Sequence, residues 1–289
     1  MTSAGSPTER SLKMSTHKSV LLQEVVDGLA LKPGETLVDG TFGGGGHTRE
    51  IVRRYGDKVK VITIDQDPST GADITGNFRD IDKLLGETKP DAILLDLGFS
   101  SDQMDTSGRG FSFQKDEPLD MRMGQSGPTA AEILNSWDEH AIELILRGFG
   151  EERFSKKIAR AIVSRRKIQP FATTFDLADT VLSVRPRTFR DKIHPATKTF
   201  QALRIAVNEE LSALEKGLEK GFEALKPGGR FAVISFHSLE DRMVKNFFRD
   251  NRKEGKAELV TKKPITPSEE ETRENPRSRS AKLRIIKKI

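Results

Sequence analysis

Three short apolar segments limit most strongly what this chain can fold into. They are 35–39 (ETLVD), 59–65 (VKVITID) and 91–98 (DAILLDLG). Each is nearly continuous in apolar residues, as strands buried on both faces are. Helix-compatible stretches at 17–30 and 47–55 alternate with them. This alternation predicts an α/β fold built on a parallel, doubly wound sheet.

The next segment of this kind is 230–236 (RFAVISF), about 130 residues further on and more than a simple crossover needs. The intervening residues have helical patterns, and apolar residues in the last stretch recur at spacings of three and four. We expect helices at 129–147, 150–167, 173–184 and 197–225. The chain is therefore predicted to be a sheet domain interrupted by a helical insertion.

The C-terminal part is expected to complete the sheet. We predict a helix at 238–250 and strands at 257–262 and 282–289. The polar stretch 264–280 is rich in Pro and Glu and then in Arg, so we expect a mobile loop there.

Composition excludes several classes of protein. The chain has no cysteine, which rules out disulfides, thiolate zinc sites and cysteine nucleophiles. No apolar run reaches the roughly 18 residues of a membrane span, and the first dozen residues lack the apolar core of a signal peptide. We therefore expect a cytoplasmic protein without a membrane segment. The net charge of +5 comes from clustered basic residues, which suggests a polyanionic partner.

The glycine-rich stretch 38–48 (VDGTFGGGGHT) directly follows the first predicted strand, where an open parallel sheet binds its ligand. This position disfavours a flexible linker. The dinucleotide fingerprint G-x-G-x-x-G fails, because counting from Gly43 its third glycine would fall on Thr48. The stretch is closer to the D/E-x-G-x-G-x-G form of S-adenosylmethionine sites, with Asp39 in first place and Thr41 replacing the first glycine.

Carboxylates also end the next two predicted strands. Asp65 stands twenty residues after Gly45 and can accept hydrogen bonds from ribose hydroxyls, in a NAD site as well as in an S-adenosylmethionine site. By itself it would be read as a solvated loop carboxylate. Asp96 closes an apolar strand, which is costly unless the carboxylate is paired or functional.

Longer strings support a family resemblance that runs from about His17 to Arg284. They include HKSVLLQEVVDGL, DGTFGGGGH, IDQDP, LLDLGFSS, GRGFSF, PLDMRM, FGEERFSKKIARAIV, HPATKTFQALRIAVNEEL, PGGRFAVISFHSLEDRMVK and NPRSRSAKLR. Together they resemble the RsmH (MraW) family of bacterial methyltransferases. These enzymes use S-adenosylmethionine to methylate N4 of one cytidine in the decoding region of 16S ribosomal RNA.

The resemblance implies a fold and a set of site residues. The fold is a class I S-adenosylmethionine methyltransferase, Rossmann-like, with an inserted helical domain. The implied regions are a disordered extension (1–13), the methyltransferase domain (14–110 and 200–289) and the inserted substrate-recognition domain (111–199). The implied cofactor residues are Gly45, Gly46, His47, Asp65, Phe78, Asp96 and Gln103. No metal is implied.

Two departures from the family pattern affect this site. Between Asp67 and Asn77 the chain has too few residues for the helix and the part of a strand that the family usually carries there. The resemblance therefore does not decide the structure of the local sheet edge or the shape of the adenine pocket. The other is Phe99, where the family string reads GVSS.

The implied chemistry needs positioning more than activation. The cytosine amine is a poor nucleophile, so it must be held in line with the methyl group while acceptors take its protons. Candidates are the Asp96 carboxylate and the carbonyls of Leu97 and Gly98. His237 would orient the base, or it would lie in a helix cap formed by Ser238 with Asp241. Methylation at C5 is excluded, because it needs a cysteine.

Basic residues outline an RNA surface on the predicted insertion and the C-terminal tail. They are Arg153, Lys156, Lys157, Arg160, Arg165, Arg166, Lys167, Arg185, Arg187, Arg190, Lys192 and those of 277–284. We expect phosphate contacts from them, although a basic helix face is often merely solvated. The resemblance implies 16S rRNA as partner, within an assembled or nearly assembled small subunit, and leaves open the oligomeric state, a dimer being one option. A NAD-dependent oxidoreductase and a non-enzymatic RNA-binding factor are the alternatives.

Overall fold

The computed structural model describes residues 19–98, 108–124 and 127–289. The predicted extension at 1–13, the cofactor contact Gln103 and the variant position Phe99 lie outside the described residues.

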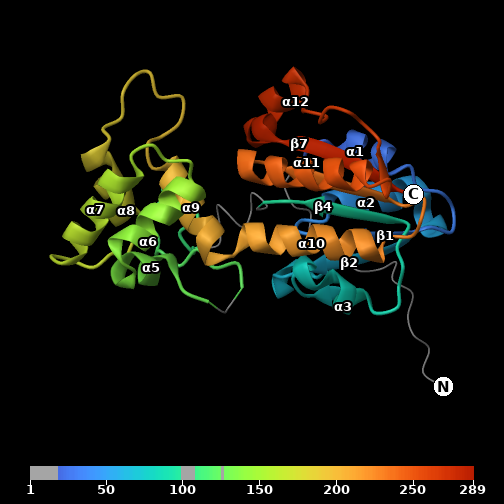
Figure 1. The fold of residues 1–289 in the computed structure, drawn as a ribbon, viewed down its shortest axis with the longest axis horizontal. Coiled ribbons are helices and arrows are strands. Elements are labelled where there is room, and N and C mark those ends of the chain that lie inside the picture. The colour runs from blue at the N-terminus through green and yellow to red at the C-terminus, as the bar shows by residue number, and fades with distance from the viewer. Residues whose placement is uncertain (1–18, 99–107, 125–126) are drawn as a thin grey trace.

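A seven-stranded sheet in the order β3-β2-β1-β4-β5-β7-β6 forms the frame of the molecule (Figure 1). Its strands are β1 (Thr36–Asp39), β2 (Lys60–Asp65), β3 (Ile74–Thr75), β4 (Ala92–Asp96), β5 (Arg230–Ser235), β6 (Ala257–Leu259) and β7 (Lys282–Lys288). β1 pairs in parallel with β2 and β4, β4 pairs in parallel with β5, and β7 runs antiparallel to β5. The six predicted strands are confirmed. In the shortened segment, β3 has only two residues and pairs with the end of β2.

Apolar side chains on both faces explain why the strand sequences are nearly continuous in apolar residues. Val38 and Ile93 point into one core cluster, whereas their chain neighbours Leu37 and Leu94 point into another. The first cluster is covered by α3 (Ile81–Leu85), α10 (Glu210–Ala224) and α11 (Ser238–Lys253). The second is covered by α1 (Leu22–Leu29) and α2 (Gly46–Tyr55). Short 3-10 turns are η2 (Gly56–Lys58), η3 (Pro68–Thr70) and η4 (Phe78–Asp80).

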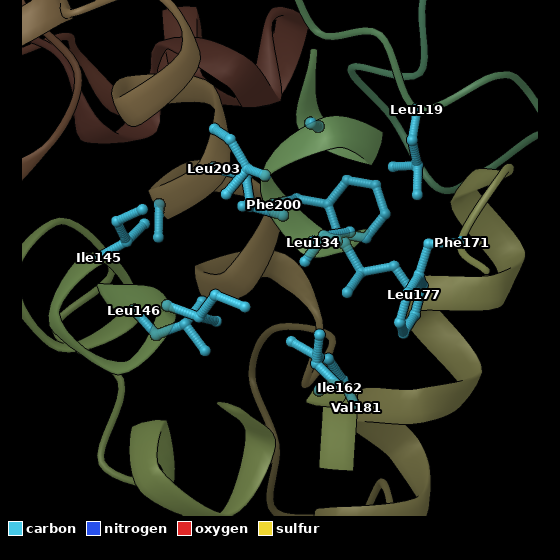
Figure 2. Packing of buried hydrophobic residues seen from close by; sticks show 14 of the residues in the cluster. Leu119, Leu134, Ile145, Leu146, Ile162, Phe171, Leu177, Val181, Phe200 and Leu203 are labelled. Carbon is cyan, nitrogen blue, oxygen red and sulfur yellow. The ribbon is translucent and has the colours of Figure 1, made fainter. Parts of the chain in front are cut away.

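A helical region with its own core lies to one side of the sheet (Figure 1). It consists of α5 (Ala130–Ser136), α6 (Glu139–Gly148), α7 (Ser155–Arg166), α8 (Thr174–Val184) and α9 (Thr197–Val207). Figure 2 shows one side chain from each helix meeting in this core, among them Leu134, Leu146, Ile162, Leu177 and Leu203. All five are fully buried. None of the helices in the described part of the chain is long and apolar enough to cross a membrane.

Two helices predicted as continuous are each divided in two. The expected helix 129–147 breaks at Trp137, because Asp138 caps a second helix by accepting a hydrogen bond from the amide of Ala141 at 2.8 Å. The expected helix 197–225 breaks at Asn208 and Glu209, where Glu209 has a φ of 49°. The side-chain amide of Asn208 holds this break by donating to the carbonyl of Met121 at 2.8 Å.

The prediction of a mobile loop at 264–280 is wrong. This stretch folds into α12 (Glu269–Glu274), capped by Ser268, and η5 (Pro276–Ser280). Oε1 of Glu271 accepts a hydrogen bond from the amide of Leu21 at 2.8 Å, which ties α12 to the start of the sheet region. The polar composition of this stretch predicted a loop, but the stretch contains a short capped helix, and a long-range hydrogen bond from Leu21 helps to hold that helix in place.

The separate core of the helical region leads to a stability prediction. We expect Leu134→Ala to lower the free energy of unfolding by about 2–5 kcal/mol, because it leaves a cavity among fully buried side chains. Ile168→Ala is the matched control, since Ile168 is 90% exposed, and should change it by no more than about 0.5 kcal/mol. Urea unfolding of both variants provides the measurement, and equal effects would contradict the assigned core.

Candidate functional site

A cavity of about 530 Å³ opens at the carboxyl ends of the parallel strands, where the sheet region meets the helical region. The residues ending β1, β2 and β4 are Asp39, Asp65 and Asp96. The cavity is lined by all the described residues that the sequence predicted for the site: Gly45, Gly46, His47, Asp65, Phe78, Asp96 and His237. Residues far apart in the chain are thus brought to one edge of the sheet.

The glycine-rich loop needs its glycines for close packing and for backbone conformation. Gly43 and Gly45 have φ values of +51° and +69°, a region that side chains rarely adopt. A Cβ on Gly46 would lie 1.8 Å from Oγ of Ser19. Gly45 is also the N-cap of α2, so no side chain of the cap residue covers the first turn of this helix. The loop therefore presents bare backbone to the cavity.

The Asp65 carboxylate holds the loop in place. Its Oδ2 accepts a hydrogen bond from the amide of Gly43 at 2.7 Å, and its Oδ1 accepts one from the amide of Asp67 at 2.8 Å. Burial raises the pKa of Asp65, while these two amide hydrogen bonds favour its charged form. Asp65 is thus a fixed acceptor at the rim of the cavity.

Thr41 explains why the first glycine of the motif is replaced here. Its Oγ1 accepts a hydrogen bond from the amide of Asp96 at 2.6 Å, which joins the ends of β1 and β4. Its amide donates to Oδ1 of Asp39 at 3.2 Å, and Oδ2 of Asp39 accepts from the hydroxyl of Thr48 at 2.7 Å. Asp39 is deeply buried, and burial raises its pKa to about 6. Asp39 therefore stabilises the loop through its hydrogen bonds with Thr41 and Thr48.

Asp96 is the most perturbed carboxyl group in the cavity. Burial, reinforced by the negative charges of Asp39 and Glu240, raises the pKa of Asp96 to about 8. Its Oδ2 lies 3.5 Å from Nδ1 of His47, whose Nε2 donates to the carbonyl of Val20 at 3.0 Å. In the tautomer that donates from Nε2, the unprotonated Nδ1 lies on the side of the Asp96 carboxyl group. Oδ1 of Asp96 is buried and accepts no hydrogen bond from the residues that the structure describes.

Phe78 is held by α10. A Cβ on Gly217 would lie 2.5 Å from Cδ2 of the Phe78 ring, so the glycine lets the helix pack directly on the ring. The ring forms an apolar part of the cavity wall, which suits a flat heterocycle.

His237 caps α11 itself, so the predicted cap by Ser238 and Asp241 is wrong. Nδ1 of His237 accepts from the amide of Glu240 at 3.4 Å, and Oε2 of Glu240 accepts from the amide of His237 at 3.2 Å. Nε2 of His237 lies 3.1 Å from Oε1 of Glu240. Asp241 instead pairs with Arg284 at 2.8 Å and with Lys282 at 3.0 Å. Arg284 is thereby used inside the fold and does not belong to the expected RNA surface.

Sequence reasoning missed an ion pair on the cavity wall. Nε and Nη2 of Arg204 donate to the two carboxylate oxygens of Glu210 at 2.8 and 2.9 Å. Glu210, His237 and Glu240 also place one potential metal-ligating atom each within 4.8 Å of the others. Because Arg204 already engages both oxygens of Glu210, we assign no metal to this group.

The helical region contributes an aromatic part of the wall. The rings of Phe113 and Phe200 meet edge to face at 4.9 Å between centroids, and both residues line the cavity. Phe111 lines it as well, and Arg277 reaches it from η5. The strings GRGFSF, with Phe111 and Phe113, and HPATKTF, with Phe200, were the sequence signals for these aromatic residues, but they carried no geometry.

Residues 14–289 match the sequence model of the MraW methylase family. The chain belongs to this family. Three curated relatives, each named ribosomal RNA small subunit methyltransferase H, illustrate the similarity. The relative from Trichlorobacter lovleyi is 46% identical and covers 94% of this chain and 98% of its own length. Those from Methylorubrum populi and Deinococcus deserti are 48% and 47% identical, covering 93% and 94% of this chain and 86% and 93% of their own lengths.

Membership of the MraW methylase family confirms the predicted class I methyltransferase fold and S-adenosylmethionine as the cofactor. The cavity fits that cofactor. Gly45 and Gly46 line the cavity with backbone alone, because their Cβ positions are taken by Phe42 and Ser19, and Phe78 offers a flat apolar surface. Asp65, which ends β2, is an acceptor for ribose hydroxyls on the cavity lining.

The raised pKa of Asp96 predicts how stability depends on pH. Between pH 3.8, which is the ordinary pKa of an aspartate, and about pH 8, Asp96 of the folded protein keeps a proton that it releases in the unfolded chain. Rising pH therefore lowers the free energy of unfolding across this interval, by at most about 1.4 kcal/mol per pH unit for one proton. Asp96→Asn should flatten this fall in urea unfolding measured between pH 5 and 8.

The control for this experiment is Asp91→Asn, which removes one carboxylate at the opposite end of β4. It should keep the fall of the wild-type protein. A pH dependence of Asp96→Asn that matches the wild-type curve would show that Asp96 is ionised in the folded state.

Proposed function

We propose that this chain transfers the methyl group of S-adenosylmethionine to the N4 amine of a cytidine in the decoding region of 16S ribosomal RNA. Its family and the names of its relatives support this assignment. The observation that carries it is the cavity itself, in which a glycine-rich loop and the strand-ending carboxyl groups of Asp65 and Asp96 face an aromatic wall of the helical region.

One part of the cavity is suited to the cofactor. The backbone of Gly45 and Gly46 and the carboxylate of Asp65 would hold its amino acid and ribose parts, and Phe78 its adenine. His47 would act through Asp96, because its ring lies next to the Asp96 carboxyl group and helps to position it. When bound, S-adenosylmethionine supplies an electrophilic methyl group.

The other part of the cavity is suited to the amine. The lone pair of the exocyclic nitrogen is delocalised into the ring, so orientation must supply much of the rate. The Asp96 carboxyl group lines the cavity and can accept a hydrogen bond from the amine, and the carbonyls of Leu97 and Gly98 are further acceptors. Each transfer forms one N–C bond and releases one proton from the amine. His237 is held by Glu240 in an orientation that allows it to position the base.

Exposed cations of the helical region would hold the RNA on either side of the target nucleotide. Arg153, Lys156, Lys157, Arg160 and Lys167 are exposed along α7 or next to it. Arg165 and Arg166 do not belong to this set. Arg165 pairs with Asp176, and Arg166 donates to the carbonyls of Leu134 and Trp137 at 2.8 and 2.6 Å.

We also propose the setting in which this reaction takes place. The substrate would be the assembled or nearly assembled small subunit in the cytoplasm. In such a subunit the target RNA strand would be held in an accessible position, where exposed cations of this protein can contact its phosphates. Residues 111–199 would serve as the substrate-recognition domain, and 14–110 with 200–289 as the methyltransferase domain. Dimerisation would be compatible with this arrangement.

Nucleoside mass spectrometry tests the assignment. Small subunits from a strain lacking this gene are incubated with the purified protein and methyl-labelled S-adenosylmethionine. We expect label in N4-methylcytidine. Label in another nucleoside would contradict the substrate, whereas binding of NADH in place of S-adenosylmethionine would indicate an oxidoreductase. Binding of RNA with neither cofactor would indicate an RNA-binding factor.

Asp65 provides a test of the cofactor half. Asp65→Ala should weaken binding of S-adenosylmethionine by about 1–3 kcal/mol, because a buried charged acceptor is lost and the loop loses its hydrogen bond at Gly43. Isothermal titration calorimetry measures the dissociation constant. Asp91→Ala is the matched control, because it also removes a carboxylate that accepts a hydrogen bond from a backbone amide. Asp91 precedes β4 and lies at the end of the strands opposite the cavity. An unchanged dissociation constant for Asp65→Ala would contradict the ribose role.

A further inference from the structure

One aromatic ring stands almost entirely in solvent. Phe189 is 94% exposed and lies in the connection between α8 and α9. In Figure 1 this connection, coloured yellow, extends away from the packed helices. Exposing an apolar ring of this size has no benefit for folding, because burying it would be worth about 1.5–3 kcal/mol. Single exposed apolar residues are common on protein surfaces, so a role for this ring has to be argued from its surroundings.

The loop around Phe189 is built to hold the ring in place. Asp191 forms an ion pair with Arg185, and its Oδ2 accepts hydrogen bonds from the amide and the hydroxyl of Thr188 at 2.8 and 2.9 Å. The amide of Asp191 in turn donates to the carbonyl of Thr188 at 3.1 Å. One carboxylate thus closes the turn that carries Phe189. A preorganised loop loses little entropy when a partner binds.

Positive charge surrounds the ring. Arg187, Arg190 and Lys192 are exposed, and the Arg190 guanidinium carbon lies 5.3 Å from the centroid of the Phe189 ring. At the base of the loop, Arg185 lies over the ring of Phe154 at 5.9 Å. Alternating aromatic rings and guanidinium groups are the combination that binds single-stranded nucleic acid, through stacking on bases and contact with phosphates. Hydrophobic protein partners are disfavoured by this density of like charge.

The loop also lies within reach of the cavity. His194 follows it, and its ring packs on Phe113 at 4.7 Å between centroids, while Phe113 lines the cavity. His194 is five positions after Phe189, so their Cα atoms are at most about 18 Å apart. An RNA strand whose target base enters the cavity can therefore reach Phe189 with a nearby nucleotide.

We propose that Phe189 stacks on an unpaired base of the RNA substrate close to the target nucleotide, with Arg187 and Arg190 on the adjacent phosphates. This inference rests on the proposed function for the identity of the RNA. The stacking itself does not depend on methyl transfer, so it is measured separately.

Fluorescence anisotropy of the full-length protein tests the stacking, with a labelled single-stranded oligoadenylate of about 12 nucleotides as the probe. We expect Phe189→Ala to raise the dissociation constant about 5- to 100-fold and Phe189→Trp to leave it within about twofold of the wild-type value. Phe189→Leu keeps an apolar side chain without a π face and should behave like the alanine variant. Wild-type affinity in the alanine or leucine variant would overturn the proposal.

The salt dependence separates stacking from charge. Phe189→Ala removes no cation and should keep the wild-type slope of log dissociation constant against log salt concentration, whereas Arg190→Ala should lower it by about 0.7. Val52→Ala and Arg252→Ala are matched controls on α2 and α11, and both should bind as the wild type does. A lowered slope for Phe189→Ala would overturn the stacking role.

Methyl transfer to small subunits is measured on the same preparations. If no variant and no wild-type protein methylates cytidine, the proposed function fails while the stacking result stands. If the wild type methylates and Phe189→Ala binds the probe as tightly, the inference fails and the proposed function stands.

Discussion

Parallel pairing of β1 with its two neighbours is the constraint on which the site depends. In this arrangement the carboxyl ends of β2, β1 and β4 meet at one edge, so that Asp65, Asp39 and Asp96 come together although the chain separates them widely. The hydrogen bond from the Asp96 amide to Thr41 fixes the distance between two of these ends. Burial, reinforced by neighbouring carboxyl groups such as Asp39, then raises the pKa of Asp96, so the perturbed chemistry of the cavity follows in part from the strand order.

Much of this could be predicted from the sequence, for a physical reason. Strands buried on both faces are nearly continuous in apolar residues. The composition of 35–39, 59–65 and 91–98 therefore predicts buried strands and disfavours surface segments. A loop of four glycines between a strand and a helix has few other uses than close approach to a ligand. The helical region was foreseeable from its length and periodicity, but the ends of its helices were not, because capping by Thr129 and Asp138 depends on side-chain geometry.

The part of the site that sequence reasoning missed depends on a helix break. In one continuous helix, the side chains of residues six apart point about 120° away from each other, so Arg204 and Glu210 would not meet. The break at Asn208, held by its hydrogen bond to Met121, turns the chain and brings them into a two-point ion pair on the cavity wall. Similarly, α12 is stabilised by a hydrogen bond from Leu21, 250 residues away in the chain, which no local pattern can reveal.

The charges of the molecule are separated in a way that suits a polyanionic substrate. The cavity is rich in carboxyl groups, whereas exposed cations lie on α7 and on the loop between α8 and α9. Phosphates are attracted by the second region. Most charges of the first region are balanced within the protein, since Arg204 pairs with Glu210 and the raised pKa of Asp96 keeps that carboxyl group protonated near neutral pH. An RNA strand can therefore lie with its backbone on the helical region and place an uncharged base in the cavity.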